Sequence, residues 1–239
     1  MPQDQPHHIS AAYDADLRRL REMIARMGGL AERQVADAGY ALARRDPDLA
    51  GEVVGRDGPI DTLEREVETF CVRLLATRAP VAVDLRFIVA ALKVSQDIER
   101  IGDYARNVAK RAIVVSQQTF NGGLNGFQWM SQLVQRNLKD AIDALVRDDA
   151  DLAERVWAAD APVDDLYTSI FREMVTHMME DPRNITAATH MLFIAKNFER
   201  IGDHATNIAE TVYYAVRGDV LPEDRPKADV SADPMPARA

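Results

Sequence analysis

Two nine-residue segments of the chain carry the same row of carboxylate and amide side chains. They read ERIGDYARN, from Glu99 to Asn107, and ERIGDHATN, from Glu199 to Asn207. Residues four apart lie on one face of a helix, so the acids and the amide of each segment form a single row. The two rows are Glu99, Asp103 and Asn107, and Glu199, Asp203 and Asn207. Oxygen ligands of this kind bind hard or borderline cations such as Mg²⁺, Mn²⁺ or iron.

A second acidic row is expected on the preceding helix of each copy, at the edge of its apolar stripe. Its members are Asp57, Asp61 and Glu64 in the first copy and Asp160, Asp164 and Asp165 in the second. Like charges four apart on a helix oppose each other by roughly 0.2–0.5 kcal/mol. Because the Glu99 row lies about 120° from the middle of its apolar stripe, we expect these acids to face solvent. Spacing alone leaves two interpretations open, a surface cation site or a solvated face balanced by arginines such as Arg100, Arg106 and Arg200.

The repeat extends well beyond these acids. Residues 46–63 align with residues 149–166 at a shift of 103, and the shift falls to 100 before Glu99. Each copy has a proline in the connection where the shift changes, and proline breaks helices. Each copy therefore predicts three long helices. They span 10–45, 47–77 and 84–118 in the first copy, and 127–147, 150–179 and 184–217 in the second.

The predicted fold class is all-α, with two tandem three-helix antiparallel bundles related by internal duplication. Long helices joined by short connections pack antiparallel, which gives one bundle per copy. The first bundle is expected over residues 8–120 and the second over residues 121–218, with a break at NGGLNG. The proline-rich tail at 219–239 is expected to be mostly disordered. Gly102 and Gly202 lie within apolar stripes, where we expect a neighbouring helix to approach closely.

Composition limits the function classes. The 239 residues are 47% hydrophobic and 28% charged, as in an ordinary globular protein. The net charge of −9 argues against nucleic acid as a partner and against unaided attachment to anionic lipid. A single cysteine, Cys71, suits a reducing compartment, and no apolar run approaches the ~20 residues of a membrane span. We expect a cytoplasmic protein that reaches a membrane only indirectly, through its partners.

Catalytic motifs are missing from the sequence. No glutamate is followed by a histidine three residues later, which excludes the usual di-iron carboxylate pattern. The phosphate loop, the dinucleotide fingerprint and the G-x-S-x-G elbow are also absent. The sequence therefore predicts no catalytic residues and no enzyme.

The repeated E-R-I-G-D-x-x-x-N motif in tandem bundles resembles the PhoU family of phosphate transport accessory and regulatory proteins. The resemblance covers the chain from about His8 to Gly218. Supporting segments are MGGLAERQ at 27–34, DPDLA at 46–50, DLR at 84–86 and MMEDPR at 178–183. It implies a cytoplasmic, all-helical protein, often a homodimer, that represses the phosphate-starvation response when phosphate is plentiful. Its implied partners are the ATPase subunit of the phosphate ABC transporter and the phosphate-sensing histidine kinase.

The same resemblance implies metal ions on the bundle surface, since some members bind iron or zinc clusters through E/D-x-x-x-D acids. Manganese or magnesium would suit the same oxygen ligands. Carried over to this chain, the acids are Glu99 with Asp103 and Glu199 with Asp203, with Asp57, Asp61, Asp160 and Asp164 as neighbours. The alternative function is a metal store or metal-dependent enzyme that uses these acids.

Overall fold

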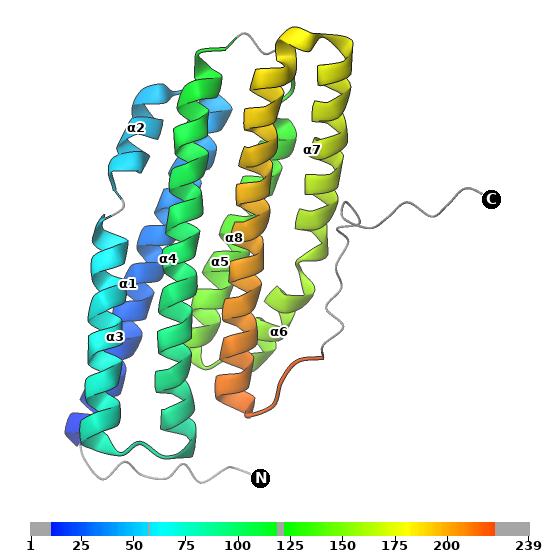
Figure 1. The fold of residues 1–239 in the computed structure, drawn as a ribbon. Coiled ribbons are helices and arrows are strands. Elements are labelled where there is room, and N and C mark those ends of the chain that lie inside the picture. The colour runs from blue at the N-terminus through cyan, green and yellow to red at the C-terminus, as the bar shows by residue number, and fades with distance from the viewer. Residues whose placement is uncertain (1–10, 57, 119–121, 223–239) are drawn as a thin grey trace.

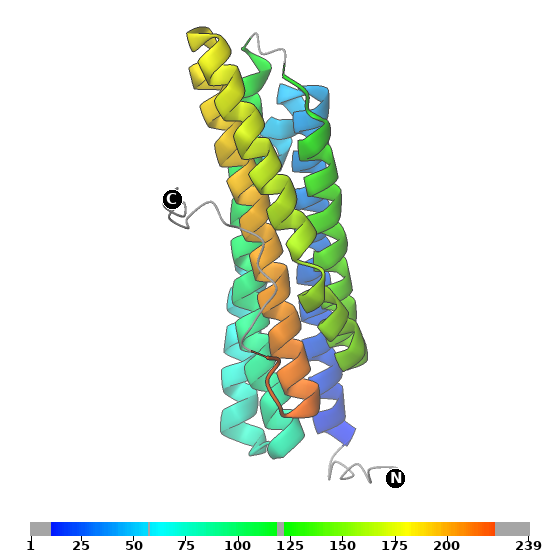
Figure 2. The ribbon, with the colours of Figure 1, turned by 90° about the vertical axis from the view of Figure 1, so that its right-hand side faces the viewer.

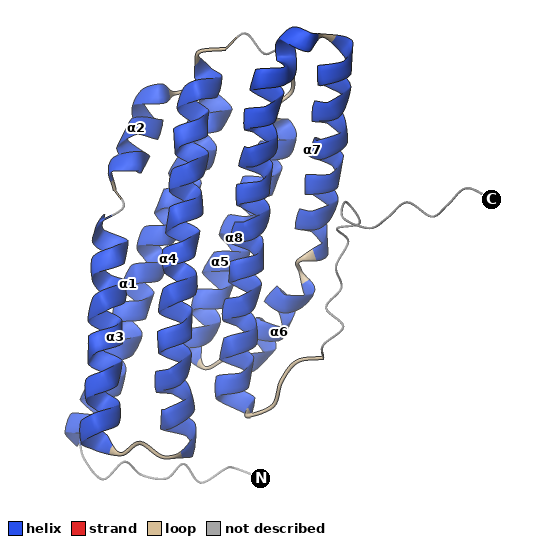
Figure 3. Ribbon diagram, in the orientation of Figure 1, coloured by secondary structure: helices blue, strands red, loops and turns tan. Residues whose placement is uncertain are grey.

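The regular structure of this computed structural model is entirely helical over the residues it describes, which are 11–56, 58–118 and 122–222 (Figure 3). The helices of the first copy are α1 (Ala11–Arg44), α2 (Pro47–Gly55), α3 (Gly58–Arg78) and α4 (Ala82–Ser116). Those of the second are α5 (Asn125–Arg147), α6 (Ala150–Ala158), α7 (Ala161–Glu180), the short 3₁₀ helix η1 (Pro182–Asn184) and α8 (Ile185–Arg217). The predicted all-α, internally duplicated architecture is confirmed.

The second helix of each copy is broken in two, so the predicted continuous helices over 47–77 and 150–179 are wrong. The breaks fall between α2 and α3 and between α6 and α7. Pro59 and Pro162 occupy equivalent positions just after the breaks, each as the second residue of the new helix. Proline has no N–H to donate and disfavours helical backbone in the residue before it, so the helix restarts there. The second break places Asp160 at the N-terminus of α7.

The helices form two layers (Figures 1 and 2). In Figure 1, α4 and α8 run antiparallel at the centre, with α2 and α3 on one side and α6 and α7 on the other. α1 and α5 form the layer behind them. α4 packs more extensively on α8 than on any helix of its own copy. The two copies are therefore fused along their third helices.

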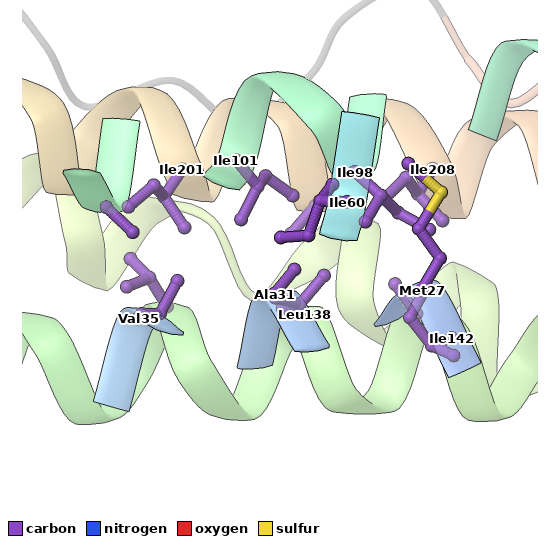
Figure 4. Close-up of a cluster of buried hydrophobic side chains, with 14 of the residues drawn as sticks. Met27, Ala31, Val35, Ile60, Ile98, Ile101, Leu138, Ile142, Ile201 and Ile208 are labelled. Atoms are coloured by element: carbon purple, nitrogen blue, oxygen red, sulfur yellow. The ribbon is translucent and has the colours of Figure 1, made fainter. Parts of the chain in front are cut away.

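One hydrophobic core runs through both copies. Side chains of α1 and α5 point toward those of α4 and α8 in Figure 4. The labelled residues of this cluster are Met27, Ala31, Val35, Ile60, Ile98, Ile101, Leu138, Ile142, Ile201 and Ile208, all of them buried. A shared core of this size holds the acid-bearing helices α4 and α8 in a fixed register.

The two glycines of the repeated motif lie where helices approach closely, as expected. A β-carbon on Gly102 would lie 3.0 Å from Ile60 Cδ1 of α3, and one on Gly202 would lie 3.4 Å from Val163 Cγ1 of α7. Each glycine therefore lets the preceding helix of its copy pack against the acid-bearing helix.

The division of the chain at 8–120, 121–218 and 219–239 stays a prediction. Its boundaries near residues 8 and 120, and most of the predicted tail, lie outside the described residues. None of the described helices has the length and apolar character needed to span a bilayer.

Candidate functional site

The second copy brings its two acidic rows together between α7 and α8. Asp160 and Asp164 come from α7, and Glu199 and Asp203 come from α8. The Thr206 hydroxyl lies 3.4 Å from Asp160 Oδ1 and can donate to it, while it also lies 3.2 Å from the Gly202 carbonyl oxygen. Asp164 and Asp203 are both close enough to Glu199 to raise its pKa. We call Asp160, Asp164, Glu199 and Asp203 the second acidic cluster.

Three of these acids are buried, so the expectation that they face solvent is wrong for them. Asp160, Asp164 and Glu199 are 2%, 4% and 7% exposed, while Asp203 is half-buried. The helical-wheel estimate failed because α8 has partners on more than one side. It packs on α4 and α5 through its apolar stripe, and also on α6 and α7. A position about 120° from the stripe therefore faces α7 and not water.

The first copy forms an equivalent cluster that is more open. Asp61 and Glu64 of α3 lie close enough to Glu99 to raise its pKa, as does Asp103. The side chains of Glu99 and Asp103 are 24% and 26% exposed. We call Asp61, Glu64, Glu99 and Asp103 the first acidic cluster. Asp57, which the sequence also predicts here, lies outside the described residues.

The two predicted amide ligands, Asn107 and Asn207, and the remaining acid of the predicted rows, Asp165, lie on the same helices as the clusters. Asn107 and Asn207 are half-buried, one turn beyond Asp103 and Asp203 on α4 and α8. Asp165 is exposed on α7, next to the buried Asp164. The structure thus groups the two ERIGD acids of each copy with the acids of the preceding helix, as the sequence predicted.

Basic side chains neutralise part of each cluster. Arg106 Nη2 donates to Asp103 Oδ1 at 2.7 Å, and Arg100 lies 3.6 Å from Glu99 Oε2. In the second cluster Lys196 Nζ donates to Glu199 Oε1 at 2.8 Å. These short contacts compensate carboxylates that would otherwise repel one another in a partly desolvated space.

The acidic clusters fit an iron, zinc, manganese or magnesium ion poorly as they stand. Over residues 11–56, 58–118 and 122–222, no group of three or more His, Cys, Asp or Glu side chains is arranged to hold a metal ion. The ammonium of Lys196 already occupies one oxygen of Glu199, the most buried acid of the ERIGD pairs. A metal ion at these acids stays a prediction.

Both ERIGD glutamates have a pKa above the ordinary value for glutamate. For Glu199 the largest cause is desolvation by burial, and the negative charges of Asp203 and Asp164 add to it. For Glu99 desolvation is again first, followed by the charge of Asp103. The folded state therefore holds protons on these carboxyl groups more tightly than the unfolded chain does.

Stability should fall as pH rises through the window set by these shifts. The unfolded chain releases the Glu199 proton near the ordinary value of 4.5, while the folded chain retains it to a higher pH. Within that window the folded state binds more protons, so the free energy of unfolding decreases with pH. We expect Glu199→Gln to gain stability relative to the unaltered protein as pH increases above about 4.5.

Urea denaturation of both proteins at a series of pH values checks this expectation. Glu154→Gln is the matched control, because Glu154 is exposed on α6. A stability difference for Glu199→Gln that is constant with pH, or that shrinks as pH rises, would contradict the shift.

Between the clusters, α4 and α8 carry a row of polar and aromatic contacts that the sequence did not single out. His204 Nδ1 lies 2.8 Å from Asp97 Oδ1, and the His204 ring lies 5.5 Å from that of Tyr104. The Arg200 guanidinium lies 5.5 Å from the centre of the same Tyr104 ring. His204 is half-buried and joins the two copies.

A second group of contacts lies further along the same pair of helices. The Arg111 guanidinium stacks 4.2 Å above the ring of Phe193, and Arg111 Nη1 lies 3.3 Å from His190 Nδ1. Burial and the charge of Arg111 lower the pKa of His190. Phe193 itself is 49% exposed. We call the two groups of contacts between α4 and α8 together the seam. Its residues are Asp97, Tyr104 and Arg111 of α4 and His190, Phe193, Arg200 and His204 of α8.

One signal in the sequence could have located the seam. Tyr104 and His204 are equivalent residues of the two copies, and so are Asp97 and Asn197. Equivalent residues that meet, as Tyr104 and His204 do, lie next to a pseudo-twofold axis that relates the copies. The contact reveals that α4 and α8 pack on each other through the same face.

Two copies of one helical unit, fused through α4 and α8 and bearing equivalent acidic clusters, define a duplicated helical-bundle protein. A model of the PhoU domain matches the chain twice, over residues 24–112 and 127–212. The chain belongs to the PhoU family.

Two relatives align with nearly the whole chain. A phosphate-specific transport system accessory protein PhoU homolog from Caulobacter vibrioides is 49% identical over 224 residues, 93% of this chain and 97% of the relative. The homolog from Rhizobium meliloti is 43% identical over 226 residues, 94% of this chain and 95% of the relative.

Solved structures agree with this assignment. The crystal structure of PhoU from Pseudomonas aeruginosa has a TM-score of 0.84 and 44% identity, and the match covers 87% of this chain and all of that one. The phosphate transport system regulatory protein PhoU from Streptococcus pneumoniae has a TM-score of 0.80 and 27% identity, with 88% and 99% of the chains covered.

Proposed function

We propose that this protein regulates phosphate uptake and phosphate-starvation signalling. Membership of the PhoU family, matched in both copies, is the observation that carries the proposal. The relatives are accessory proteins of phosphate-specific transport, and one structural neighbour is a regulatory protein of a phosphate transport system. In the proposed role the protein is a cytoplasmic adaptor between the ATPase subunit of the phosphate ABC transporter and the phosphate-sensing histidine kinase. It keeps the response repressed when phosphate is plentiful.

The seam is the surface that we propose for docking a partner. It runs along two long helices held by the shared core, so its side chains keep fixed relative positions. Arginine and aromatic residues, which are enriched at the energetic centres of protein interfaces, come together there as Arg111 on Phe193 and Arg200 on Tyr104. Phe193 is about half exposed as a residue, so it leaves apolar surface for a partner to bury.

Deleting the gene is expected to switch on phosphate-starvation genes in medium rich in phosphate. A transcriptional reporter measures the effect, and the intact gene supplied in trans should restore repression.

A gene that carries Phe193→Ala with Arg111→Ala should restore repression poorly, because both side chains of the exposed contact are lost. Trp129→Ala is the matched control, since Trp129 is 65% exposed on α5 in the other layer. Unchanged repression in the deletion strain would contradict the proposed function.

The same strains identify the partners. Capture of the full-length protein from phosphate-replete cells should recover the transporter ATPase subunit and the kinase, and the Phe193 and Arg111 changes should reduce the recovery of both.

A homodimer, which the proposal includes, is checked by light scattering of the purified protein. The proposed role involves no catalytic turnover. A purified protein that hydrolysed a phosphate ester, and lost this activity with Asp103→Ala plus Asp203→Ala, would contradict it.

A further inference from the structure

Each acidic cluster contains a positive charge that the chain itself supplies. In the second cluster, Lys196 Nζ lies 2.8 Å from Glu199 Oε1 and 5.0 Å from the centre of the Tyr167 ring. The ammonium thus lies between α8 and α7, in contact with the Glu199 carboxylate of α8 and the Tyr167 ring of α7. In the first cluster, Arg106 Nη2 lies 2.7 Å from Asp103 Oδ1. Both contacts have the length of a charge-assisted hydrogen bond.

The two copies share their acids but not these bases. At the shift of 100 residues, Lys196 corresponds to Gln96 and Arg106 corresponds to Thr206. Thr206 hydrogen-bonds within the second cluster, where it lies 3.4 Å from Asp160 Oδ1. The Tyr167 ring next to Lys196 corresponds to Glu64, an acid of the first cluster. Lys196 and Arg106 therefore each stand where the other copy has a neutral residue, whereas Arg100, which is 61% exposed beside the first cluster, corresponds to Arg200.

The position of Lys196 is incompatible with a divalent ion on the same glutamate. A divalent cation bound to Glu199 Oε1 at about 2.0–2.2 Å would lie within about 5 Å of an ammonium that is 2.8 Å from the same oxygen. Glu199 is only 7% exposed, so solvent screens the repulsion between the two cations weakly. Glu199 Oε2 is buried and has no hydrogen-bond partner among the described residues. It is therefore an oxygen that a cation could bind once Lys196 is removed.

We propose that Lys196 and Arg106 are tethered counter-ions that take the place of a divalent cation in the two acidic clusters. The unaltered chain then excludes such ions from these clusters, in contrast to the metal sites that family resemblance implied. Removing either base creates a carboxylate site for a divalent cation in its own cluster. The inference concerns the ion chemistry of this chain and does not depend on the proposed partners.

Titration with Mn²⁺ tests the proposal. The full-length chain without an affinity tag is freed of metal with a chelator, and Mn²⁺ binding is followed by electron paramagnetic resonance and calorimetry. Lys196→Gln and Arg106→Thr each introduce the residue that the other copy carries at that position. We expect each variant to gain about one Mn²⁺ per chain, bound at least about tenfold more tightly than by the unaltered protein. Mn²⁺ should also raise the melting temperature of each variant.

Two further variants make the result specific. Lys196→Arg keeps the positive charge and should continue to exclude Mn²⁺, while Glu199→Gln added to Lys196→Gln should remove the gained site. Tight Mn²⁺ binding by the unaltered protein that Glu199→Gln or Asp103→Asn abolishes would overturn the proposal. Folded Lys196→Gln and Arg106→Thr proteins that gain no ion would also overturn it. Circular dichroism checks folding, and if Lys196→Gln does not fold, Arg106→Thr in the more open first cluster decides the matter.

Discussion

Replacing Gly39 with valine is expected to lower the free energy of unfolding by about 2–3 kcal/mol, because it overpacks the contact between α1 and α5. A β-carbon at Gly39 would lie 2.0 Å from Ser131 Oγ and 2.8 Å from Ser131 Cβ. The hydroxyl can rotate away, but the β-carbon is fixed to the backbone of α5, so the helices must separate. Thermal unfolding should show a melting temperature lower by roughly 5–10 °C.

A matched glycine replacement should have the opposite sign. Gly51 lies in α2 and a β-carbon there would meet no atom within 4 Å. Gly51→Ala should therefore raise stability by about 0.5–1 kcal/mol, since alanine favours helix over glycine. Adding Ser131→Gly to Gly39→Val should recover part of the loss, because it removes the two nearest atoms. Equal effects of Gly39→Val and Gly51→Ala would show that α1 and α5 are not packed as described.

The contact between Gly39 and Ser131 involves positions that each have an equivalent in the other copy, but the contact itself could not be predicted from the sequence. At the shift of 103 residues, Gly28 corresponds to Ser131 and Gly39 to Ile142. In the structure Gly28 lies against Ile142, while Gly39 lies against Ser131. The two contacts are therefore related by the same pseudo-twofold arrangement that brings Tyr104 to His204. The repeat predicts which residues are equivalent, but it does not say which equivalent faces meet.

Local patterns predicted the elements well, since helix periodicity and caps act over a few residues. α2 begins at Pro47, and the carboxylate of the preceding Asp46 accepts from the backbone N–H groups of Asp48 and Leu49. The break before α3 was missed because the predicted helix was continued through Gly58 and Pro59. Proline is tolerated in the first turn of a helix but not in its interior, so Pro59 belongs to the start of a new helix. The equivalent break before α7 places Asp160 at the N-terminus of that helix, next to α8.

The sequence predicted which acids form the candidate site, but it did not predict their burial or the basic residue beside them. Spacing correctly placed Glu199 and Asp203 on one face and brought Asp164 near them. Burial could not be inferred, because it depends on α7 packing against α8 at a side of the helix that a single wheel marks as polar. Lys196 was missed for a related reason. It is absent from the repeated motif, and only the folded chain brings its ammonium to Glu199.

The largest loss of stability is expected from Phe198→Ala, at about 3–5 kcal/mol. Phe198 is completely buried on α8, and its Cζ would lie 3.8 Å from a β-carbon on Gly39, so the ring reaches α1 of the other copy. Removing the ring leaves a cavity where the two copies share their core. Because that core is continuous, urea should unfold the variant and the unaltered protein in a single transition, with the midpoint lowered.

Two controls separate this role from a general effect of losing an aromatic ring. Phe198→Ile introduces the residue that the first copy carries at Ile98, and should cost less than alanine because most of the volume is kept. Phe171→Ala removes a ring that is 40% exposed on α7 and should cost far less than Phe198→Ala, because that ring is only partly withdrawn from water. Two separate unfolding transitions, with only the later one shifted by Phe198→Ala, would mean that the copies are independent bundles. The seam would then lack the rigid support that the proposed docking requires.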